Sequence, residues 1–195
     1  MTTLFERAGE RRARRRRPAS RPPGPDLIWL SEADARSLEA LGRQPLERVV
    51  AATPPSEAEA LRIMSGVEVL AGHSPLHSSY PPAMLEARVA PSLELGQFRY
   101  YIDPRGVQLA FCNWAWLDPQ VLREALSTGR DLETAEFQCG DLPFFYELLA
   151  PFGHCRAVVR DLRGMPCFAC RRIPAIRGEV RRAGAAQPRV AHFQF

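Results

Sequence analysis

The chain has 195 residues, of which 46% are hydrophobic and 25% are charged, and its formal net charge is +4 at pH 7. This length and balance are typical of a soluble globular protein with one domain, and they argue against two. No apolar run approaches the ~20 residues that span a bilayer, and Arg residues crowd the N-terminus where a secretory signal would be uncharged, so we expect a cytoplasmic protein.

The first 26 residues form an arm in which Arg and Pro dominate. Six of the seven residues from Arg11 to Arg17 are Arg, and a Pro-rich stretch follows to Pro25. Like charges repel and few apolar residues are present to bury, so we expect residues 1–26 to be disordered. Such an arm binds nucleic acid or another acidic surface electrostatically, or it is a solvated tail, and the sequence leaves both interpretations open.

Residues 27–62 predict a helical N-terminal extension. Ser31 is placed to cap a helix that ends near Gly42. The Pro-Pro-Ser sequence at 54–56 then breaks the chain and caps a second, short helix through Leu61. This extension is either an added subdomain or a helical lead-in to the following domain.

Residues 63–195 show a mixed pattern of helices and strands. Helices are expected at Pro82–Leu95, Asp118–Leu126 and His154–Leu162. Strands are expected at Gln97–Ile102, Val107–Trp116, Pro143–Leu149, Cys167–Ile173 and Arg189–Phe195. The turn Asp103-Pro104-Arg105-Gly106, with Pro at its second position, joins the first two strands into a hairpin. Helices around a mostly antiparallel sheet predict an α/β or α+β single domain.

The sequence contains five Cys, an odd number, with no export signal, so we expect reduced thiols rather than a disulfide framework. His154, Cys155, Cys167 and Cys170 have the residue types of zinc ligands and include a Cys-x-x-Cys pair. The second pair lies in an apolar, strand-like run, whereas structural zinc sites join two close couples flanked by turns. We therefore interpret these residues as core thiols and expect no metal.

Several short strings in residues 63–195 occur in the order and spacing of one known family. They are Ser74-Pro75-Leu76-His77 with Tyr80-Pro81, Val89-Ala90-Pro91, Gln97-Phe98, Ala110-Phe111-Cys112-Asn113-Trp114-Ala115, Gly140-Asp141, Phe144-Phe145-Tyr146-Glu147, Ala150-Pro151-Phe152-Gly153 and Arg189-Val190-Ala191-His192-Phe193. Any one string is weak, but together they cover about two-thirds of the chain. Residues 63–195 resemble the RTX toxin-activating lysine acyltransferases.

The resemblance implies a fold like that of the GCN5-related acetyltransferases, with a mostly antiparallel central sheet flanked by helices, and a homodimer. It also implies a reaction in which acylated acyl carrier protein donates a fatty-acyl group to internal lysines of an RTX protoxin. Neither a bound cofactor nor a metal is expected. No Gly-rich phosphate cradle is evident, which suits an acyl carrier protein donor rather than coenzyme A.

The resemblance also implies the catalytic residues, because family members use a His and an Asp. The His falls on His77, whereas the position of the Asp is occupied here by Glu147, which is longer by one methylene. Asp141, six residues earlier, is a rival for the role of the carboxylate. Ser74 is a supporting residue, either as an acyl-accepting nucleophile or as part of a turn.

The chemistry needs a base because a lysine side chain, with a reference pKa near 10.4, is a free amine in only about one part in 2,500 at pH 7. A neutral imidazole accepts the proton as the amine attacks the thioester, so His77 is the candidate base. Glu147 would fix its tautomer and offset the imidazolium charge.

Two other functions remain open from the sequence. One is a regulator that binds nucleic acid through the arm, although no helix-turn-helix, zinc-finger or RNA-binding signature supports it, so nucleic acid is not an expected partner. The other is a catalytically degenerate family member that acts as a scaffold, because Glu147 replaces the family Asp.

Overall fold

The computed structural model describes residues 42, 45–49, 54–177 and 188–195. The Arg-rich arm, the helix expected after Ser31 and the segment 178–187 lie outside these residues. The described residues form a mixed α/β fold with an open six-stranded sheet in the order β1-β2-β3-β4-β5-β6. No helix of the described part is long and apolar enough to cross a membrane.

The sheet is antiparallel at every junction except β4–β5, which is parallel and has Phe145 opposite Ala175 as its one register pair. Its strands are β1 (Glu47–Val49), β2 (Phe98–Ile102), β3 (Gln108–Leu117), β4 (Leu142–Leu149), β5 (Arg172–Arg177) and β6 (Arg189–Gln194). The long central strand β3 is buried along nearly its whole length because helices cover both faces of the sheet.

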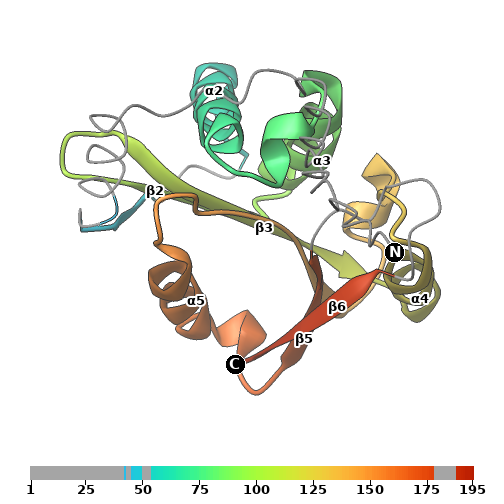
Figure 1. Ribbon diagram of the computed structural model, residues 1–195. Helices are drawn as coiled ribbons and strands as arrows, with labels where there is room; N and C mark the ends of the chain where they lie inside the picture. The colour runs from blue at the N-terminus through green and yellow to red at the C-terminus, as the bar shows by residue number, and fades with distance from the viewer. Residues whose placement is uncertain (1–41, 43–44, 50–53, 178–187) are drawn as a thin grey trace, which may run out of the picture.

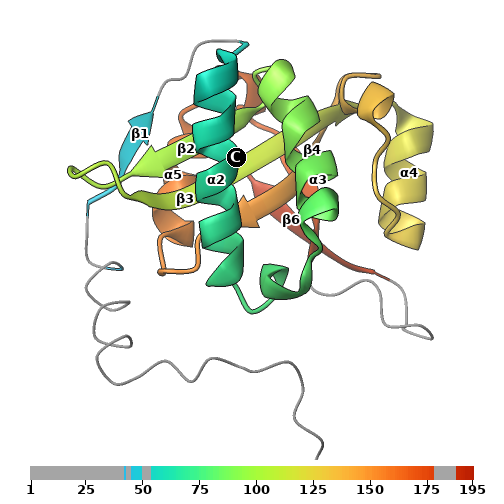
Figure 2. The same ribbon diagram turned by 90° about the horizontal axis from the view of Figure 1, so that it is seen from above.

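Four α-helices surround the sheet in the described part: α2 (Glu57–Gly72), α3 (Pro82–Glu94), α4 (Pro119–Thr128) and α5 (Cys155–Arg163). Short 3₁₀ helices lie at η1 (His77–Ser79), η2 (Thr134–Phe137) and η3 (Pro166–Phe168). Figure 1 shows α2 and α3 on one face of the sheet and α5 on the other, with α4 near the end of β3. Seen from above, α2 and α3 run side by side across the central strands (Figure 2).

Apolar side chains fill the space on both faces of the sheet. Under α2 and α3 the core contains Ile63, Val67, Leu85, Val89 and Phe111 among others. On the other face α5 packs through Val158 and Leu162 against Trp114, Phe145, Phe168 and Ile173. A third cluster joins α4 and η2 to the ends of β3 and β4.

Most predicted elements of residues 63–195 are confirmed to within about two residues at their ends, including the helix at 82–94 and the hairpin of β2 and β3. The turn at Asp103 forms because its backbone N–H donates to Val107 O at 2.8 Å and its carboxylate accepts from the N–H groups of Arg105 and Val107. Asp103 thereby closes the hairpin.

Three predicted elements are wrong in part. The second helix of the extension begins after Ser56 as predicted but continues past Leu61 to Gly72, because apolar residues at helical spacing keep it against the sheet. The predicted helical region 27–62 also contains strand β1, which is too short for its alternation to be visible in sequence. The strand expected from Cys167 is instead η3, and β5 begins only at Arg172 because Cys170 has a φ of 59°.

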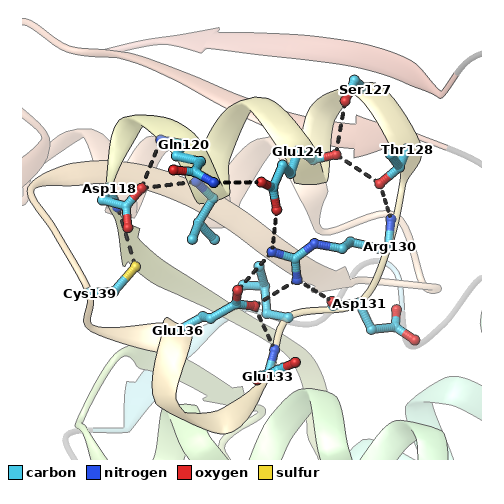
Figure 3. Close-up of polar contacts among 12 residues, drawn as sticks. Asp118, Gln120, Glu124, Ser127, Thr128, Arg130, Asp131, Glu133, Glu136 and Cys139 are labelled. Carbon is cyan, nitrogen blue, oxygen red and sulfur yellow. Dashed lines mark hydrogen bonds and ion pairs between the residues drawn. The ribbon is translucent and has the colours of Figure 1, made fainter.

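Asp118 starts α4 as predicted, and its carboxylate accepts from the N–H groups of Gln120 at 2.7 Å and Val121 at 2.9 Å (Figure 3). These backbone hydrogen bonds lower the pKa of Asp118. A lowered folded-state pKa stabilises the fold above the unfolded pKa, and this contribution is lost as the pH falls through the folded value. Asp118→Ala should therefore lower the melting temperature by a few degrees near neutral pH.

The difference in melting temperature between Asp118→Ala and the unsubstituted protein should be smaller at acid pH, below the ordinary pKa of an aspartate, than at neutral pH, because Asp118 takes up a proton there. Thermal unfolding followed by circular dichroism at both pH values checks this. An equal difference at the two pH values would show that the cap does not act through its charge.

Candidate functional site

His77 lies at the turn between α2 and α3, below the surface of the protein. The chain folds tightly here because the N–H groups of His77 and Ser78 both donate to Ser74 O, at 3.1 and 2.9 Å. The His77 residue is only 4% exposed. The turn thus places one His side chain against the central strands.

Both ring nitrogens of His77 have partners. Nε2 lies 2.8 Å from Glu147 Oε2, and Nδ1 lies 2.7 Å from Ser74 Oγ. A carboxylate only accepts hydrogen bonds, so Nε2 carries the proton that it donates to Glu147. In the neutral ring Nδ1 is then the free base, and it accepts from the Ser74 hydroxyl.

The resulting order, carboxylate then imidazole then hydroxyl, is that of a catalytic triad, and it brings together Glu147, His77 and Ser74. In such an arrangement a carboxylate can orient the ring, the ring can act as a base, and the hydroxyl can pass a proton or act as a nucleophile. His77 and Ser74 are both buried, and the Ser74 hydroxyl occupies the hydrogen-bonding position at Nδ1.

Glu147 is held on β4 by an irregularity in the sheet. Asn113 of β3 is opposite Glu147, but the next residue, Trp114, is opposite Phe145, so Tyr146 is an extra residue on β4. Such a bulge redirects the side chains around it. Tyr146 and Glu147 consequently both contact Arg88 of α3.

The side chain of Asn113 holds the backbone around Glu147 and Arg88 in place. Its Oδ1 accepts from the Glu147 backbone N–H at 2.8 Å, and its Nδ2 donates to Arg88 O and to Ser92 Oγ, both at 2.9 Å. The side chain of this fully buried residue therefore joins β3, β4 and α3 at the level of the carboxylate. Each of these polar groups is satisfied, which is required of polar atoms in a core.

Arg88 is the second partner of the Glu147 carboxylate. Its Nη1 is paired with Glu147 Oε1 and its Nη2 with Asp131 Oδ1, so the guanidinium bridges two carboxylates. The aromatic rings of Tyr80 and Tyr146 lie 5.0 and 5.2 Å from its central carbon. Burial by itself would lower the pKa of Arg88, but Glu147, Tyr146 and Asp131 raise it overall.

The two tyrosines stay protonated in this surrounding. Burial is the largest cause that raises the pKa of Tyr146, to about 12. Burial followed by the charge of Glu147 raises the pKa of Tyr80. Both rings therefore face the site as neutral groups near pH 7.

Asp141 does not belong to this cluster. It is exposed just before β4 begins at Leu142, and it lies six positions before Glu147, roughly 20 Å along an extended strand. Its backbone carbonyl accepts a hydrogen bond from Arg171 at 3.1 Å. The structure brings Glu147, and not Asp141, to His77.

The sequence interpretation missed Arg88, Asn113 and Asp131. Asn113 had a visible signal, because it is the one polar residue in the run from Leu109 to Leu117. Arg88 lies among the inward residues of α3, at helical spacing from Leu85 and Ser92, which also signals a buried charge. Asp131 lies in a loop and carries no such signal.

The predicted core thiols are wrong for three of the four residues considered for zinc. Cys155, Cys167 and Cys170 are exposed and free, and only Cys112 is buried among the Cys residues of the described part. Burial raises the pKa of Cys112 to about 12. No group of three or more His, Cys, Asp or Glu that could hold a metal ion occurs in the described residues.

The chain matches the RTX toxin acyltransferase family over residues 56–194. It is 42% identical over 106 residues to the lysine-acyltransferase RtxC of Vibrio cholerae, a match that covers 54% of this chain and 69% of that protein. It is 28% identical over 122 residues to the leukotoxin-activating lysine-acyltransferase LktC of a Pasteurella haemolytica-like species, covering 63% and 70%. It is 30% identical over 101 residues to the RTX-I toxin-activating lysine-acyltransferase ApxIC of Actinobacillus pleuropneumoniae, covering 52% and 58%. The chain belongs to the RTX toxin acyltransferase family.

Proposed function

We propose that this member of the RTX toxin acyltransferase family transfers a fatty-acyl group from acylated acyl carrier protein to internal lysines of an RTX toxin, which it thereby activates. The family match and the names of its relatives support the reaction class. Glu147, His77 and Ser74 form a buried hydrogen-bonded series, the relay, and this observation supports these residues as the catalytic groups.

In the proposed reaction the lysine amine attacks the thioester carbonyl, an amide C–N bond forms and the thioester C–S bond breaks. The proton of the amine passes to His77 Nδ1, and the ring returns a proton to the departing thiolate. Glu147 holds the ring in the tautomer whose free nitrogen faces the substrate and stabilises the imidazolium that forms. The thiol of the carrier and the acylated lysine are the products.

Ser74 has two proposed roles that differ in chemistry. It either relays the proton from the amine to His77 or attacks the thioester itself and forms an acyl-serine intermediate. A relay can be replaced by direct contact or by water, so Ser74→Ala should then lower the rate only about 10-fold. A nucleophile cannot be replaced, so the same change should then abolish turnover.

Single-turnover mixing with acylated carrier alone, followed by mass analysis of the quenched protein, separates the two roles of Ser74. An acyl adduct on the unsubstituted protein that is absent from Ser74→Ala indicates a nucleophile. Ser79→Ala is a suitable control, because Ser79 is exposed and donates only to Leu76 O in the same turn.

Three further properties belong to the proposal. We place residues 63–195 in one catalytic domain, together with the first turns of α2 and strand β1, which belong to the same helix and sheet. Its fold is of the GCN5-related acetyltransferase type, for which the mixed sheet with one parallel junction is the supporting feature. The protein acts as a homodimer in the cytoplasm, without a bound cofactor. Residues 1–26 are an accessory arm rather than part of the catalytic machinery.

The test of the function is an in vitro acylation followed by intact mass. The purified chain is mixed with an unmodified RTX toxin and either acylated acyl carrier protein or acyl coenzyme A. The chain contains no Lys, so a lysine-linked gain of mass arises only on its partners. A toxin mass gain with the carrier donor is expected, and deletion of residues 1–26 should leave it largely intact. A folded protein that acylates nothing would leave the scaffold function instead.

A further inference from the structure

We propose that Arg88 is a positioning residue that offsets the negative charge on Glu147 and so keeps His77 a neutral base. This inference rests on the proposed function, since it concerns the same relay. Arg88 lies on α3, and its side chain is 15% exposed while that of Glu147 is 4% exposed. Water therefore does little to screen the charges that meet here.

The geometry divides the Glu147 carboxylate between two donors. Oε2 accepts from His77 Nε2 at 2.8 Å, and Oε1 accepts from Arg88 Nη1. The second arm of Arg88 reaches Asp131. The guanidinium is thus held through both Nη1 and Nη2, and it cannot rotate away from Glu147 without breaking its ion pair with Asp131.

The clamp that Arg88 forms with Glu147 and Asp131 sets the net charge beside His77. The groups that face the Glu147 carboxylate and its neighbours are His77, Arg88, Asp131, Tyr80 and Tyr146, the last two uncharged. With Arg88 present, the two carboxylates and the guanidinium sum to one negative charge. Without it they sum to two negative charges, of which that on Glu147 is buried and that on Asp131 is partly exposed, and two negative charges beside His77 favour the imidazolium. A protonated ring cannot accept a proton from the substrate amine.

The loop that carries Asp131 is itself fastened, as Figure 3 shows. Arg130 donates to both oxygens of Glu136 at 2.7 Å, to Glu124 at 3.2 Å and to the carbonyl of Asp131 at 3.0 Å. This network ties the loop after α4 to η2. It holds Asp131 where its carboxylate meets Arg88, so the clamp extends from the loop through α3 to the relay.

The test compares Arg88→Met, which removes the charge, with Arg88→Lys, which keeps it. The first readout is the pH dependence of kcat/KM for acyl transfer. We expect its acidic limb to move up by about one pH unit or more in Arg88→Met and to stay near that of the unsubstituted protein in Arg88→Lys. Arg123→Met is the matched control, because Arg123 is exposed on α4.

The second readout needs no activity. The imidazole resonances of His77, assigned by their loss in His77→Ala, are followed by NMR against pH. Their midpoint should rise in Arg88→Met and fall back in the double variant Arg88→Met, Glu147→Gln. The NMR titration can be read even if the protein acylates nothing. Failure of the proposed function is therefore distinguished from failure of the clamp.

The proposal is overturned if Arg88→Met is folded and slower but leaves both the limb and the His77 midpoint unchanged, because Arg88 would then only support the fold. It is equally overturned if Arg88→Lys shifts them as far as Arg88→Met does. If Arg88→Met does not fold, the proposal is tested with Arg88→Lys and with Asp131→Asn. Asp131→Asn removes one negative charge and leaves Arg88 in place, so it should lower the midpoint of the His77 titration.

Discussion

His77→Ala should reduce the rate of acyl transfer by about 10³-fold, which is within the range that a positioned general base contributes. The substitution removes the one group in the relay that can take a proton from the amine near neutral pH. Ser74 and Glu147 remain, but no base then connects them. Initial rates of toxin acylation, measured by intact mass, check the prediction.

The matched control for His77→Ala is His73→Ala, four residues earlier in the chain. His73 is exposed, and its ring lies at a tilt to that of Phe152 with 5.3 Å between the ring centres. Its loss should leave the rate within about twofold of the unsubstituted protein. Equal rates for the two variants would remove His77 from the mechanism.

Glu147→Gln should reduce the rate by about 10²- to 10³-fold and also lower stability. The amide has one oxygen and one NH₂ group, so it cannot accept from both His77 Nε2 and Arg88 Nη1 as the carboxylate does. One donor then faces another donor, and breaking a buried ion pair typically costs about 3–5 kcal/mol. Acylation rates and denaturant unfolding, measured on the same preparation, check both effects.

Glu147→Asp separates the effect of the negative charge from the effect of side-chain length. It keeps the carboxylate but withdraws it by about 1.5 Å, one C–C bond length, so the contacts with His77 and Arg88 cannot both persist without backbone movement. We expect a loss of activity smaller than that of Glu147→Gln. Glu86→Gln, exposed on the same helix as Arg88, is the control. If Glu147→Gln were as active as this control, the carboxylate would have no role in the reaction.

Much of the fold follows from patterns in the sequence. The Asp118 cap, the Asp103 turn and the helical spacing of Leu85 and Val89 are local signals, and the structure has the corresponding elements. The strand β1 and the extra length of α2 depend on packing against the sheet, which no local pattern records. Cys170 likewise interrupts the strand predicted from Cys167, so that β5 begins only at Arg172, through a backbone conformation that its residue type rarely adopts.

The relay itself was predictable only in part. The motif around His77 and the spacing of Glu147 suggested the pair, and the structure brings them together with Ser74. Their surroundings were not predictable, because Arg88 and Asp131 lie on a helix and a loop that meet only in three dimensions. The bulge at Tyr146, which lets neighbouring residues contact one helix, depends on strand register rather than on composition.

Peptide mapping of an RTX toxin, after incubation with the chain and acylated acyl carrier protein, separates an acyltransferase from an inactive scaffold. We expect fatty-acyl groups on internal lysines of the toxin, linked as amides that resist hydroxylamine, and we expect none when His77→Ala replaces the unsubstituted protein. Acyl groups that appear equally with His77→Ala, or no acyl groups with a folded protein and a competent donor, would contradict it.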